Sequence, residues 1–165
     1  MNEKREMLRH FLAALAYRVQ KTLRDAPEGF ETFSPGNQVR TPHELLCHIT
    51  SVLGYARTFF IGGFYPRPVP LELTRDIATF HDILADLSRH LSHNSPLDGT
   101  DEERLLQGPF ADAMAHAGQL AMLRRLYGSP IPPENFIVAD ISKEKLGPDQ
   151  SPPVSPDDDW PERPS

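Results

Sequence analysis

Four long segments with the apolar periodicity of an α-helix constrain the fold more than any other feature of the sequence. Segments 3–24, 41–61, 74–91 and 109–127 repeat apolar side chains at steps of three and four residues, the spacing that lines one face of a helix. Proline and glycine separate the segments, so each is expected to form its own helix. With little strand signal between them, the sequence predicts an all-α four-helix bundle.

The second segment has the clearest start signal. Thr41 can cap a helix, Pro42 suits its first position, and Glu44 stands where the acid of a capping box is found. This helix is expected to run to residue 61 and to stop at Gly62.

The length of 165 residues allows one domain with a sizeable core. Nine of the 17 prolines follow Gly128, so we predict a bundle domain over residues 1–141 and an irregular Pro- and Asp-rich tail over 142–165, disordered or draped on the surface. Residues 136–141 are expected to lie extended across the bundle. Trp160 is a candidate anchor, to the body or to a second copy.

Charge and composition exclude several classes of partner. A net charge of −6 without a basic cluster argues against a nucleic-acid partner. A single cysteine, Cys47, rules out an internal disulfide and suits a reducing compartment. No apolar run has the length of a membrane span, and the N-terminus lacks the build of a signal peptide. We therefore expect a cytoplasmic protein with no membrane partner.

The fourth segment carries a polar pair on its predicted apolar side. Asp112 and His116 are one helical turn apart and share that side with Leu120, whereas Gly118 and Arg125 lie opposite. Buried polar groups need partners, and this spacing lets both side chains approach one atom, a proton or a metal. The pair is equally compatible with a structural ion pair, or with Asp112 simply favouring the helix N-terminus.

Other residues complete or surround this candidate site. His48, at the edge of the second apolar stripe, can supply a third ligand from a facing helix, although a histidine bonded to a neighbour explains it as well. Tyr55, on the same side as His48, and His81, beside the third stripe, are candidate substrate-binding residues. Cys47 points about 100° away from His48 on a helix, which disfavours a nucleophilic pair between them.

The motif His116-Ala-Gly-Gln119 resembles the fourth-helix signature of the DinB-like (DinB/YfiT) superfamily. His48, within Leu45-Leu-Cys-His-Ile-Thr50, is similar to the histidine of that family's second helix. The helix order also resembles the family's over roughly residues 7–127. This resemblance implies a divalent-metal site at His48, Asp112 and His116, with Asp112 standing where the family usually has histidine.

The resemblance also implies a range of functions. Family members include metal-dependent hydrolases and transferases that use low-molecular-weight thiols, so a small-molecule substrate or thiol is expected. Members of the family commonly bind nickel or zinc. A carboxylate in place of one histidine shifts the metal preference of the site toward iron, manganese or zinc. The alternative is a non-catalytic homodimeric binding or regulatory module without a metal, and a homodimer is expected in either case.

Overall fold

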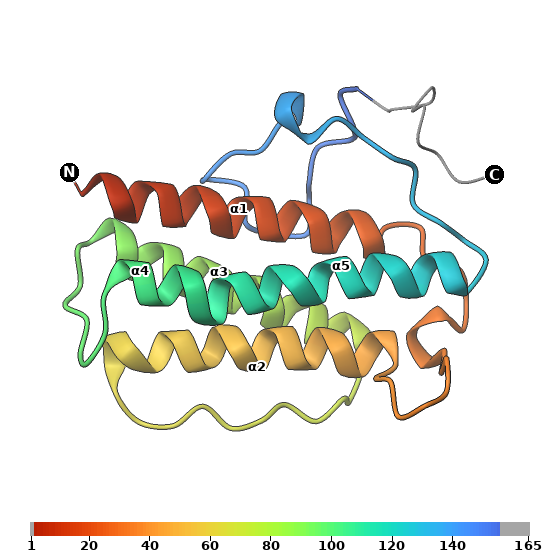
Figure 1. The fold of residues 1–165 in the computed structure, drawn as a ribbon, viewed down its shortest axis with the longest axis horizontal. Helices are drawn as coiled ribbons and strands as arrows, with labels where there is room; N and C mark the ends of the chain where they lie inside the picture. The colour runs from red at the N-terminus through yellow and green to blue at the C-terminus, as the bar shows by residue number, and fades with distance from the viewer. Residues whose placement is uncertain (1, 156–165) are drawn as a thin grey trace.

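The computed structural model describes residues 2–155 and shows a bundle of four long helices, with no strand in this range. The long helices are α1 (Glu3–Leu23), α2 (Pro42–Ile61), α3 (Leu73–Ser92) and α5 (Ala111–Leu126), which lie side by side (Figure 1). α1 and α2 each pack against both α3 and α5. The expected all-α bundle is confirmed.

Local sequence signals account for the helix ends. The Thr41 side chain accepts a hydrogen bond from the Glu44 amide at 3.2 Å, and the Glu44 carboxylate accepts one from the Thr41 amide at 2.8 Å. This is the predicted capping box. At the other end of α2, Gly62 has φ 73°, a conformation that glycine adopts without steric cost.

The core lies along the bundle axis. Its aromatic centre includes Phe80 and Phe110, both fully buried, and the Phe110 ring stacks on Phe11 with centroids 6.3 Å apart. Burying one such side chain contributes about 1.5–3 kcal/mol. The other large buried side chains are Tyr17, Phe30, Leu12, Leu15, Leu46, Ile49, Leu53, Leu84, Leu87 and Leu91.

The link from α3 to α5 is partly helical. A short helix α4 (Glu102–Leu105) leads into the π-type turn η2 (Leu106–Phe110), which contains Pro109. Gly108 interrupts the helical conformation there. α5 therefore begins at Ala111, two residues later than the sequence predicts.

The predicted buried face of α5 is wrong at Asp112. This residue is exposed, whereas Ala113, Ala117 and Leu120 are buried against the bundle. Leu120 and Leu123 of the predicted face are buried as expected. Alanines permit a close approach of neighbouring helices, so in the first turns of α5 the buried positions are Ala113 and Ala117 and not Asp112. His116, half-buried, lies at the margin of the buried face.

The chain after α5 folds back over α1 and α3. Residues 136–141 are only partly extended, because Phe136–Val138 form a 3-10 turn (η3), and Ile137 is 88% exposed. Within the described part of the tail, Lys143 pairs with Glu6 of α1, and the Leu146 carbonyl accepts a hydrogen bond from His81 of α3. Trp160 lies outside the described residues.

None of the helices described in residues 2–155 combines the length and apolarity needed to cross a membrane.

Candidate metal centre

Three predicted ligands meet between α2 and α5. His48 comes from α2, while Asp112 and His116 come from α5, and each offers a ligand atom within 4.8 Å of the others. The His116 Nε2 atom lies 3.3 Å from Asp112 Oδ1, and the His48 and His116 rings are 4.6 Å apart between centroids. We call His48, Asp112 and His116 the triad.

Gln119 orients one of these ligands. His116 Nδ1 lies 2.8 Å from the side-chain oxygen of Gln119, which can only accept a hydrogen bond, so Nδ1 is the protonated nitrogen. In a neutral imidazole this leaves the Nε2 lone pair directed at the triad. Such an outer hydrogen bond is the usual means by which proteins orient a metal-binding histidine.

The triad is partly buried and unequally exposed. The His116 side chain is 13% exposed and that of Asp112 is 53% exposed. Burial lowers the pKa of His48, and the nearby charge of Arg40 lowers it further. The neutral imidazole, which is the form that binds metals, is therefore favoured.

Two open clefts meet at His48. One, with a volume of about 690 Å³, is bordered by residues 38–40 and 67–70 and reaches Cys47. The other, of about 460 Å³, extends toward Tyr55 and Tyr65. Arg40 and Arg67 line both clefts, so a ligand lying beside His48 meets two positive charges.

The two residues predicted to bind substrate have different surroundings. Tyr55 is 57% exposed and lines the smaller cleft together with His48. His81 is only 5% exposed, and its polar contacts are with Gln20 of α1 and Leu146 of the C-terminal segment, not with the triad. The structure thus places Tyr55 beside the triad and gives His81 a structural contact; substrate binding by either stays a prediction.

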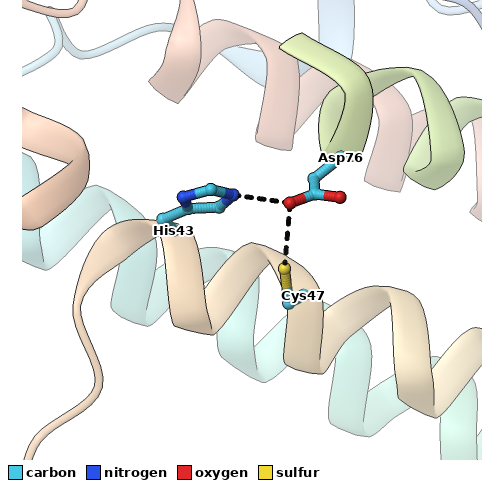
Figure 2. A group of neighbouring side chains, drawn as sticks. All are labelled: His43, Cys47 and Asp76. Atoms are coloured by element: carbon cyan, nitrogen blue, oxygen red, sulfur yellow. Dashed lines mark hydrogen bonds and ion pairs between the residues drawn. The ribbon is translucent and has the colours of Figure 1, made fainter. Parts of the chain in front are cut away.

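A second group of potential ligands was missed by sequence reasoning. His43 and Cys47 of α2 converge with Asp76 of α3, with ligand atoms within 4.8 Å of one another (Figure 2). The available signal was the four-residue spacing of His43 and Cys47, but Asp76 is brought near only by packing of α3 on α2. We call these three residues the sulfur cluster.

The sulfur cluster is a closed hydrogen-bonded group in this structure. The Cys47 thiol donates to Asp76 Oδ2 with Sγ and Oδ2 3.7 Å apart, and His43 Nε2 lies 2.7 Å from the same oxygen. Burial raises the pKa of Cys47 to about 12, and the neighbouring Asp76 charge adds to the shift. Without a metal, Cys47 is therefore a thiol and not a thiolate nucleophile at neutral pH.

Comparisons with known proteins found no match to this chain among family models, curated proteins or solved structures.

Proposed function

We propose that this chain is a DinB-like metal-binding protein whose triad holds one divalent first-row metal ion. The observation that carries the proposal is the convergence of His48, Asp112 and His116 from two helices to within 4.8 Å. The bond from His116 to Gln119 supports it, because it involves both ends of the His-x-Gly-Gln motif.

The donor set suits such an ion. Two imidazoles and one carboxylate are typical ligands of zinc, iron, nickel or manganese, and three protein ligands leave positions for water or substrate. The half-exposed Asp112 and the clefts beside His48 provide access from solvent. Asp112 replaces the histidine expected from the resemblance, and its harder oxygen donor favours zinc, iron or manganese over nickel.

The activity we propose is hydrolysis or small-thiol transfer on a small molecule. A bound divalent ion supplies Lewis acidity, which lowers the pKa of a water or thiol that binds to it. Tyr55, Arg40 and Arg67 line the space beside His48, where they can orient a substrate, and the arginines would attract its negatively charged end. We further propose that the protein acts in the cytoplasm.

Metal analysis of triad variants tests this function. Replacing His48→Ala or His116→Ala should remove one equivalent of metal per chain, as measured by elemental analysis of protein purified without chelator. The control is His10→Ala, because His10 is an exposed histidine on α1 and its loss should change nothing. An unchanged metal content in both triad variants would refute the site.

A non-catalytic homodimeric module is the second candidate. Without a metal, Asp112 and a His116 protonated on both ring nitrogens would form an ion pair. In addition, α5 exposes Met122 and Leu126 beside an apolar groove also lined by Val39. A metal ion that binds only the folded protein must raise its melting temperature. Melting that is insensitive to chelator, together with a dimer in sedimentation analysis, would favour this candidate over the enzyme.

A further inference from the structure

The sulfur cluster lies where two helices begin. His43 and Cys47 are one turn apart near the start of α2, and Asp76 is in the first turns of α3. Figure 2 shows the imidazole and the thiol approaching the same carboxylate oxygen. The Leu71 amide donates to that oxygen as well, at 3.0 Å, so the end of the link between α2 and α3 is tied to the cluster.

One distance in the sulfur cluster matches the edge of a tetrahedral zinc site, and a second is shorter. Zinc lies about 2.0–2.3 Å from its nitrogen, oxygen and sulfur ligands, so neighbouring ligand atoms of a tetrahedron are about 3.3–3.7 Å apart. The separation of Cys47 Sγ and Asp76 Oδ2 is 3.7 Å. His43 Nε2 and Asp76 Oδ2, at 2.7 Å, need to move apart by less than about 1 Å.

Burial and ligand chemistry favour this interpretation. Cys47 is 3% exposed and Asp76 is 9% exposed, so an ion held between them would be shielded from competing water. Thiolate, imidazole and carboxylate together match borderline-soft zinc. Cys47 also lines the cleft of about 690 Å³, which gives an ion a route to the sulfur.

We propose that the sulfur cluster is a second, zinc-binding site, separate from the triad. Binding breaks the S–H bond of Cys47 and forms a Zn–S bond, and the proton passes to solvent without any change of oxidation state. The hydrogen bond from His43 to Asp76 is replaced by coordination of both side chains, and the Nε2 proton is released or moves to Nδ1. A bound ion would join the start of α2 to the start of α3 and hold the 67–71 wall of the cleft beside the triad.

Cobalt is the sharpest probe, because only a site with a thiolate ligand gives a sulfur-to-cobalt charge-transfer band. We expect Co²⁺ added to chelator-treated protein to produce this near-ultraviolet band. Cys47→Ser should abolish the band. Asp76→Asn should weaken zinc affinity by more than the roughly 10–100-fold that loss of an outer-shell partner costs. His116→Ala, which lies in the other site, should leave the band intact.

Thiol protection supplies a second measurement, which leaves the three residues of the sulfur cluster unchanged. Because Cys47 is buried, iodoacetamide alkylates it in metal-free protein only slowly, when the structure opens. Zinc should slow this alkylation further, in wild-type protein and equally in His116→Ala. Absence of the cobalt band, with alkylation unaffected by zinc, would overturn the proposal whatever the triad binds. If only the triad loses its metal, the His116→Ala variant should hold fewer metal ions per chain. Its cobalt band and the zinc protection of Cys47 should be unchanged. The measurements therefore test the triad and the sulfur cluster separately.

Discussion

At the scale of single residues, one buried carboxylate attaches the C-terminal segment to α1. The Glu134 side chain is fully buried and accepts hydrogen bonds from the Tyr17 hydroxyl and the Lys21 ammonium, both at 2.6 Å. Next to it, the Arg18 guanidinium lies 3.7 Å from the centre of the Phe136 ring. A buried charge of this kind is tolerated only when its partners are in place.

Replacing Glu134→Ala should therefore be costly. It leaves the Lys21 charge buried without its partner, and such a loss destabilises a protein by about 3–5 kcal/mol. The control is Glu144→Ala, because the Glu144 side chain is 78% exposed in its pair with Arg9 and exposed pairs contribute at most about 1 kcal/mol. Urea denaturation measures both free energies of unfolding, and equal losses would contradict this account.

At the scale of elements, close packing on α2 holds the link between α2 and α3. The Tyr65 ring lies directly on Gly54, where a Cβ would come within 2.2 Å of a ring carbon. Packing therefore explains why a glycine occupies the middle of α2. Any side chain at this position would displace the link that borders both clefts beside His48.

Two glycine substitutions in helices should have opposite effects. Gly54→Ala should destabilise the protein by about 1–3 kcal/mol because it overpacks the Tyr65 contact. Gly118→Ala in α5 meets nothing within 4 Å and should stabilise it by about 0.5–1 kcal/mol, the difference in helix propensity. Thermal or urea unfolding measures both, and a stabilising Gly54→Ala would show that Tyr65 is not held on α2.

At the scale of the whole molecule, burial of His81 makes stability depend on pH. Burial lowers the pKa of His81 below its usual 6.5, although the hydrogen bond to the Leu146 carbonyl and the charge of Asp82 partly oppose the shift. The unfolded chain, with a pKa near 6.5, therefore takes up the proton first as the pH falls. The contribution of this residue to stability is present above pH 6.5 and is lost as the pH falls below it.

His81→Asn should remove this share of the pH dependence. The variant keeps a donor for the Leu146 carbonyl but cannot be protonated, so the free energy of unfolding should fall less steeply than in wild type as the pH drops below 6.5. Denaturant melts across this range measure the slope. His10→Asn, at an exposed site, should retain the wild-type slope, and an unchanged slope in His81→Asn would show that His81 titrates normally in the folded protein.

The helices were predictable because their signals are local. Apolar spacing, the Thr41 capping box and the glycine and proline breaks act within a few residues, and the observed ends of α1, α2 and α3 lie within two residues of those predicted. The spacing of Asp112 and His116 is equally local, which is why that pair was found. The prediction that His48 is a third ligand depended more on the resemblance to the DinB-like superfamily. The sulfur cluster was missed because Asp76 is 29 residues from Cys47.

The sequence by itself thus determined an all-helical chain and the pairs of polar residues one turn apart, because hydrogen bonds and side-chain contacts along a helix depend on near neighbours. Only the tertiary structure decided which side of α5 is buried, that Asp112 is exposed, and that Asp76 meets Cys47. Those outcomes depend on how far each helix rotates to pack its neighbours closely, and that rotation is set by all the contacting side chains together.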